Sequence, residues 1–170
     1  MSNTRRSFSK ILVAIDGSEI SMKAAVYAIS IANRKGNGAA SVQLIGLTVL
    51  DLTKLSSSFF ATASGYYGAG ELEAKRKEAQ RWLDKVEKLA VNKENNNNNN
   101  NGVNNIQFKS EIIEDPISKI GSAIVDYAER ENVELIVIGT RGRTGFKKML
   151  IGSVASDVVT YAHCPVLVVK

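Results

Sequence analysis

Short apolar runs alternate along the chain with segments whose apolar residues recur at helical spacing. Each run is bounded by turn-forming residues, and together they cover 11–15, 42–50, 106–113, 135–138 and 166–169. Runs of this kind are typical of strands buried on both faces of a parallel sheet. The segments between them, near 19–35, 71–90, 117–128 and 153–162, predict helices. The alternation predicts an α/β fold, an open parallel sheet of five strands with helices on both faces.

Local signals mark where several helices begin and end. Ser18 is suited to cap the first helix, which we expect to end near the glycines of 36–38. Asp115 followed by Pro116 predicts an N-cap with proline in the first helical turn. Ser153 stands at the start of the last helix, where its hydroxyl either caps the helix or donates to a bound phosphate.

Two segments carry no such periodicity. Residues 56–70 are rich in Ser, Ala, Gly and Tyr, and form either a mobile flap over a binding crevice or a linker. Residues 95–101 are seven consecutive asparagines, which offer no apolar side chain to bury. We therefore expect a single domain over 1–170 with a flexible, Asn-rich insertion at about 92–105.

Composition and charge narrow the function classes. Hydrophobic residues make up 44% of the 170 residues, enough for a core, and the formal net charge of +5 favours anionic partners without pointing to nucleic acid. Cys164 is the only cysteine and His163 the only histidine, so we expect His163 to be a structural or surface residue and Cys164 a small buried side chain. No apolar run approaches the ~20 residues of a membrane span, and the polar start lacks a signal-peptide core, so we expect a soluble cytoplasmic protein.

A glycine-rich, basic stretch joins the fourth predicted strand to the last predicted helix. It contains Gly139, Gly142, Gly145 and Gly152, the cations Arg141, Arg143, Lys147 and Lys148, and the hydroxyl of Ser153, with no acid from 140 to 156. Glycines let backbone N–H groups approach a ligand, and a helix N-terminus adds unpaired donors with positive partial charge. The alternative is an ordinary surface turn. The position between a buried strand and a helix favours a cradle for phosphate.

Other interpretations of these glycines are weaker. The chain has no Walker A pattern and no Gly-x-Gly at the first strand, so a P-loop ATPase or a dinucleotide fingerprint is not expected. Gly142-Arg-Thr-Gly145 matches the loop of an RNA-binding KH domain, but that loop joins two helices, so RNA binding is not expected either. The sequence assembles no nucleophile, base and orienting group of the kind that hydrolases need.

Asp16, Val49 and Gly139 stand at the carboxyl ends of three predicted strands. Parallel α/β sheets bind ligands at this edge, so the three residues point to one crevice. Asp16 has several interpretations: it caps a helix, accepts from the base or sugar of a nucleotide, or holds a magnesium ion through water.

Three segments together resemble the universal stress protein family of the UspA type. Residues 11–18, Ile-Leu-Val-Ala-Ile-Asp-Gly-Ser, are similar to its first strand and turn, and residues 163–169 to its last strand. The spacing Gly139-x2-Gly142-x9-Gly152-Ser153 matches its ATP-binding pattern without a gap. The resemblance implies a Rossmann-like parallel sheet of strand order 3-2-1-4-5, with ATP in the crevice between the first and fourth strands.

The resemblance also implies which residues hold the nucleotide. They are Ala14, Ile15 and Asp16 at the adenosine, the Val49 backbone at the adenine edge, Ile138 and Gly139 beside the ribose, and Gly142, Gly152, Ser153 and Val154 at the phosphates. We add Arg141 for its charge, and Ala155, where relatives often carry a hydroxyl. Mg²⁺ or Mn²⁺ would be carried by the phosphates of ATP or another adenine nucleotide, without a direct protein ligand.

Family members commonly dimerise through their fifth strands, which implies a homodimer through Val166 to Val169. Pairing with a partner strand would also cover the backbone N–H and C=O groups that an apolar edge strand leaves unpaired. The resulting hypothesis is an ATP-binding regulator or sensor in the stress response, with slow or no ATP hydrolysis. Its alternatives are a genuine ATPase or phosphotransferase and a nucleotide-free dimeric adaptor.

Overall fold

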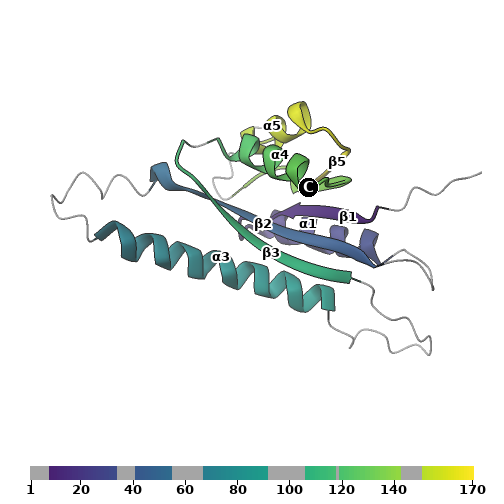
Figure 1. Ribbon diagram of the computed structural model, residues 1–170, viewed down its shortest axis with the longest axis horizontal. Helices are drawn as coiled ribbons and strands as arrows, with labels where there is room; N and C mark the ends of the chain where they lie inside the picture. The colour runs from purple at the N-terminus through teal and green to yellow at the C-terminus, as the bar shows by residue number, and fades with distance from the viewer. Residues whose placement is uncertain (1–7, 34–40, 55–66, 92–105, 118, 143–150) are drawn as a thin grey trace, which may run out of the picture.

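The computed structural model describes residues 8–33, 41–54, 67–91, 106–117, 119–142 and 151–170. Its strands are β1 (Lys10–Ala14), β2 (Val42–Asp51), β3 (Ile106–Asp115), β4 (Leu135–Gly139) and β5 (Val166–Val169). Its helices are α1 (Glu19–Ala32), the short η1 (Leu52–Lys54), α3 (Tyr67–Val91), α4 (Ile120–Arg130) and α5 (Ser153–Tyr161). The elements follow one another along the chain as the sequence predicts (Figure 1).

The strands form one five-stranded sheet in the order β3-β2-β1-β4-β5, with every pair parallel. Both the α/β class and the strand order of the prediction are confirmed. Strand order reverses at β1, whose neighbours are β2 on one side and β4 on the other. Parallel sheets of this kind open a crevice at such a point, beyond the carboxyl ends of the strands.

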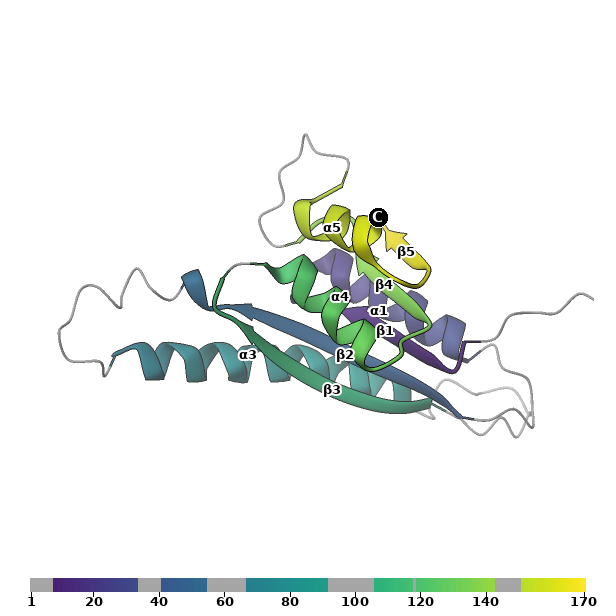
Figure 2. The ribbon, with the colours of Figure 1, turned by 45° about the horizontal axis from the view of Figure 1, so that its top comes forward.

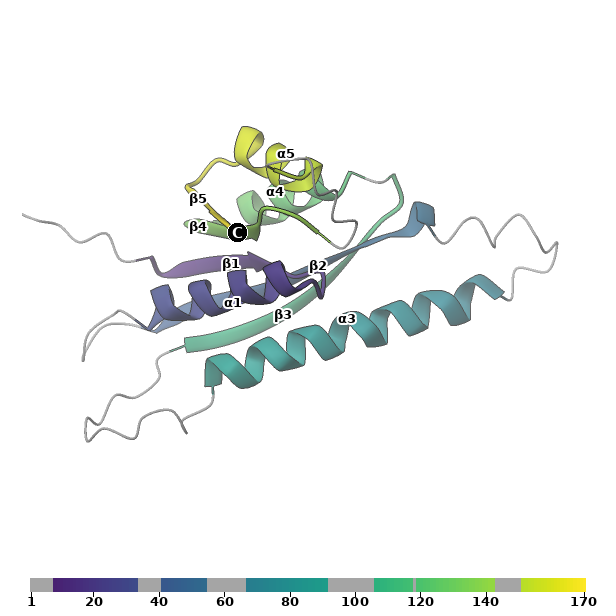
Figure 3. The ribbon, with the colours of Figure 1, turned by 180° about the vertical axis from the view of Figure 1, so that it is seen from behind.

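Helices cover both faces of the sheet. Helices α4 and α5 lie on the face turned toward the viewer in Figure 2, and α1 and α3 lie on the face seen in Figure 3. Alternate residues of β1 point to opposite faces of the sheet. Ile11 and Val13 pack in the cluster with α1 and α3, and Leu12 packs in the cluster with α4. This period of two explains why the central strands are apolar throughout.

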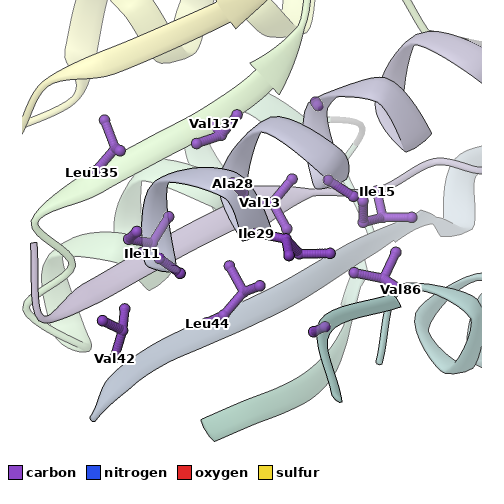
Figure 4. Close-up of a cluster of buried hydrophobic side chains, with 14 of the residues drawn as sticks. Ile11, Val13, Ile15, Ala28, Ile29, Val42, Leu44, Val86, Leu135 and Val137 are labelled. Atoms are coloured by element: carbon purple, nitrogen blue, oxygen red, sulfur yellow. The ribbon is translucent and has the colours of Figure 1, made fainter. Parts of the chain in front are cut away.

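The core on the α1 and α3 side is built from branched aliphatic side chains and alanines (Figure 4). Ile11, Leu44 and Val137 point from three neighbouring strands toward Ala28 of α1, and all four side chains are fully buried. Small residues on α1 let the helix approach the sheet closely, which suits an interior packed at crystal-like density. Among the described residues, no helix is long and apolar enough to cross a membrane.

Two helix boundaries differ from the prediction. Helix α1 ends at Ala32 rather than near 36–38, because Ala32 is the last residue of its buried face and the polar Asn33 follows as C-cap. Helix α4 begins at Ile120, so Asp115 is not its N-cap. Asp115 stays in β3 opposite Asp51, and its Oδ1 accepts from the backbone N–H of Ile117 at 2.9 Å in a turn that precedes the helix.

Some apolar positions that follow the helical spacing are exposed. Val26 of α1 is 55% exposed and Leu89 of α3 is 49% exposed, and Ile117 lies outside α4 altogether. The buried face of α3 is narrower than the pattern indicates, since it consists of Ala79, Leu83, Val86 and Ala90 with Trp82 beside them. The asparagine tract lies outside the described residues, as does most of the segment 56–70.

Candidate functional site

A pocket opens at the carboxyl edge of the sheet, where β1, β2 and β4 end and α4 and α5 begin. Every residue predicted for the nucleotide site lines it: Ala14, Ile15, Asp16, Val49, Ile138, Gly139, Arg141, Gly142, Gly152, Ser153, Val154 and Ala155. The structure adds Ser21, Leu47, Ile120, Ile124 and Thr140. The volume of the pocket is about 170 Å³.

The turn after β1 holds the Asp16 carboxylate in place. Gly17 adopts φ +79°, and Ser18 caps α1 by accepting from the Ser21 N–H at 3.1 Å. Asp16 Oδ1 accepts from the Ser18 N–H at 3.0 Å and from the Ser18 hydroxyl at 2.6 Å. The predicted cap of α1 is therefore Ser18, and Asp16 orients it instead of capping the helix itself.

The glycines of the cradle are required for space. A Cβ added at Gly142 would lie 2.7 Å from Asp16 Oδ2, and one at Gly139 would lie 2.8 Å from Cγ2 of Ile20. Neither glycine has a positive φ, and among the described residues only Gly17 and Asn132 do. The structure leaves little room for a Cβ at these two positions, and among the described glycines only Gly17 adopts left-handed backbone. That the cradle glycines let N–H groups approach a ligand stays a prediction. Gly145 lies outside the described residues.

Two backbone hydrogen bonds fix the start of α5 over the end of β4. The Gly152 N–H donates to the Thr140 carbonyl at 2.7 Å, and the Thr140 N–H donates to the Val169 carbonyl at 2.7 Å. Gly152 is the N-cap of α5 without a side-chain cap, so the predicted capping role of Ser153 is wrong. Ser153 lines the pocket instead. The Gly152 N–H already donates to the Thr140 carbonyl. The donors that α5 offers to a ligand are therefore the N–H groups of its first turn.

The opposite wall of the pocket is apolar. Leu47 and Val49 lie on the same face of β2, and Ile120 and Ile124 lie one turn apart on α4. Sequence analysis missed Leu47, Ile120 and Ile124 because their spacing fits an ordinary buried face equally well. The signal that could have found them is position: Ile120 opens a helix, and Leu47 lies two residues before Val49. This wall suits a flat aromatic group.

Charge is unevenly distributed around the pocket. Among the described residues, the charged side chains that line it are those of Asp16, in the turn after β1, and Arg141, in the loop after β4. The positive end of the α5 dipole lies on the same side as Arg141. No group of three potential metal ligands occurs among the described residues. Arg143, Lys147 and Lys148, predicted to strengthen the cradle, lie outside the described residues.

His163 and Cys164 take no part in the pocket lining. The Nε2 of His163 lies 3.1 Å from the Val133 carbonyl, and Cys164 packs against the core beneath α4 and α5. Burial raises the pKa of the Cys164 thiol, which keeps it protonated and unreactive. These contacts agree with the structural roles predicted for both side chains.

The arrangement can hold a molecule that is flat and apolar at one end and anionic at the other. The sequence profile of the Universal stress protein family matches residues 7–170. Universal stress protein MJ0531 of Methanocaldococcus jannaschii is 34% identical over 170 residues, which cover 99% of this chain and 85% of the relative. The structure of MJ0577, a universal stress protein of the same organism, has a TM-score of 0.74 at 25% identity over 97% of both chains.

A universal stress protein solved in complex with cAMP has a TM-score of 0.58 at 18% identity, covering 97% of this chain and 98% of its own, and shares the fold. The sequence and fold similarities extend over nearly all of the chain, including the strand ends that frame the pocket. The chain belongs to the universal stress protein family.

Proposed function

We propose that the pocket binds ATP, or another adenine nucleotide, and that the protein acts as a nucleotide-dependent regulator in the stress response. The observation that carries the proposal is the continuity of one pocket from an apolar wall, past the Asp16 carboxylate, to the N-terminus of α5. An adenine ring, a ribose and a phosphate chain present the same sequence of chemistry.

The residues present fit such a ligand. Ile120 and Ile124 would contact the adenine ring, with the Val49 backbone at its edge. Asp16 has a second carboxylate oxygen, Oδ2, directed toward Gly142, where a ribose hydroxyl would donate to it. The first-turn N–H groups of α5, the Ser153 hydroxyl and Arg141 would receive the phosphates. Mg²⁺ or Mn²⁺ would enter with the phosphates.

The family and fold support the proposal in part. The universal stress protein solved with cAMP carries an adenine nucleotide on the same fold. The lining contains hydroxyls and one carboxylate but no histidine or cysteine, and the carboxylate already orients the turn after β1. Binding with slow or no hydrolysis is therefore the activity that these residues support best. The dimer through β5 stays a prediction: β5 is an edge strand, and a sedimentation mass equal to one chain would contradict it.

Calorimetry with a matched pair of glycine variants tests the proposal. Gly142→Val places a branched side chain against Asp16 Oδ2, and we expect ATP affinity to fall at least tenfold because a charge-assisted bond worth about 2 kcal/mol is lost. Gly70→Val is the control, since a Cβ at Gly70 has nothing within 4 Å and the residue lies outside the pocket. Equal, undiminished affinity in both variants, or no binding to the wild-type protein, would refute the proposal.

Two further measurements define the activity. Titrations with AMP and cAMP compare the affinities of these nucleotides with that of ATP. A higher affinity for ATP would indicate that the N-terminus of α5 contacts the terminal phosphates. A turnover assay with Mg²⁺ separates regulator from enzyme. Release of phosphate faster than in a protein-free control, and lost in Gly142→Val, would favour the ATPase.

A further inference from the structure

The single tryptophan of the chain packs against the turn that carries Asp16. Trp82 lies on α3, a long helix that runs alongside β3 and α1 on the face shown in Figure 3. A Cβ added to Gly17 would lie 2.6 Å from both Cζ2 and Nε1 of the indole. The ring therefore lies in direct contact with the Gly17 backbone, so close that a Cβ at residue 17 would require the indole to move.

Gly17 is also the residue on which the geometry of the turn depends. Its φ of +79° reverses the chain between Asp16 and Ser18, and L-residues rarely adopt that conformation. On the solvent side the turn is held by the two hydrogen bonds from Ser18 to Asp16 Oδ1. On the core side it is held by Trp82. The carboxylate is thus fixed between a local hydrogen-bond pair and an aromatic ring from a helix more than sixty residues away.

The other α3 residues that face the sheet are placed differently. Ala79, Leu83 and Val86 are fully buried in the core and line no part of the pocket. Trp82 is half-buried and does not line the pocket either, so any effect on a ligand must pass through the turn. Trp82, unlike these three core residues, is placed against the turn that carries Asp16.

We propose that Trp82 is a positioning residue for the nucleotide site, holding the Asp16 turn in its binding geometry and reporting its occupancy. The inference rests on the proposed nucleotide function and adds α3 to it. A carboxylate fixed before the ligand arrives loses less conformational freedom on binding, which raises affinity without a new contact. Because the chain has one tryptophan, its fluorescence reports on the surroundings of Trp82, which include the Gly17 backbone and the edge of the core.

A double-mutant cycle between Trp82 and Asp16 tests this inference. Trp82→Ala is expected to weaken ATP binding about tenfold, and the loss should disappear when Trp82→Ala is introduced into Asp16→Ala, because the two act as one unit. Trp82→Phe, which keeps a ring against Gly17, should recover most of the affinity. Val86→Ala is the matched control: it removes a fully buried α3 side chain that lines no part of the pocket, so it lowers stability and leaves affinity unchanged. ATP should also shift the emission of the wild-type protein and not that of Asp16→Ala.

The outcomes separate the two proposals. A wild-type protein that binds no adenine nucleotide overturns the proposed function and this inference together. A wild-type protein that binds, with Trp82→Ala no weaker than Val86→Ala, overturns the positioning role alone. The same holds if Trp82→Ala costs as much affinity in the Asp16→Ala background as in the wild type, because the tryptophan would then act on the fold in general.

Discussion

Gly17→Ala should be the most costly single-methyl substitution around the pocket. The left-handed backbone at φ +79° costs an L-residue roughly 1–2 kcal/mol, and forcing a methyl group against the Trp82 ring costs about 1–3 kcal/mol. The reduced entropy of the unfolded alanine chain offsets about 0.4–1 kcal/mol. The net loss is about 1–5 kcal/mol, a large fraction of the ~5–15 kcal/mol that stabilises a typical domain.

The two contributions can be separated by a second cycle. Trp82→Ala leaves room for the added methyl group, so the double variant Gly17→Ala/Trp82→Ala should be about 1–3 kcal/mol more stable than the sum of the two losses predicts. Urea denaturation followed by far-UV circular dichroism measures all four proteins without using the tryptophan signal. Gly70→Ala is the control, because its Cβ meets nothing and alanine favours the helix.

Two results would refute this reasoning. If Gly17→Ala is as benign as Gly70→Ala, neither the backbone conformation nor the ring contact restricts the residue at 17. If the double variant is additive within about 0.5 kcal/mol, the indole does not press on Gly17, and only the backbone contribution survives.

Other parts of the structure give further predictions. Leu83→Ala should cost about 2–5 kcal/mol because Leu83 is fully buried, whereas Leu89→Ala, at a side chain 49% exposed, should cost well under half as much in the same urea titration. Ser18→Ala should cost about 1 kcal/mol by removing the cap of α1, a loss that Ser18→Thr should largely avoid in thermal unfolding. Burial raises the pKa of Cys164 above its ordinary 9.0, so the folded thiol should alkylate with iodoacetamide far more slowly at pH 9 than the urea-unfolded chain. The sign for stability follows: folding stability should fall as pH rises above about 9, and equal labelling rates in the two states would contradict the burial.

The sheet could be predicted because each strand carries its own signal, a short apolar run bounded by turn-forming residues. The runs at β1 and β4 are apolar on both faces, and only a strand covered by helices on both sides uses such a run. The strand order was available from the family resemblance, since apolar runs alone do not specify neighbours. Helix ends were less predictable where two signals compete. Asp115 and Pro116 have the composition of a helix start, but pairing of β3 with β2 through Asp115 keeps that residue in the sheet.

The pocket could be predicted in part for a related reason. Glycines and an acid at the ends of predicted strands are uncommon, so the sequence itself indicates Asp16, Gly139 and Gly142 as site residues. Ile120 and Ile124 carry no such mark, because a side chain that lines a pocket and one that fills a core follow the same spacing. Trp82 follows the same helical spacing as the buried residues of α3. Its contact with Gly17 depends on how α3 lies across the sheet, which no local pattern encodes.

The backbone of Thr140 joins the end of β5 to the start of α5 by hydrogen bonds, in addition to the side chains that the two elements pack together. Its N–H is bonded to Val169 in β5, and its carbonyl is bonded to Gly152 at the start of α5. A displacement of β5, for instance by a strand that adds to its open edge, therefore moves the first turn of α5 through a connection of two hydrogen bonds. Because the connection consists only of backbone atoms, substitutions other than proline leave its donors and acceptors in place. A strand that paired with β5 would therefore act on the geometry of the crevice through the backbone itself.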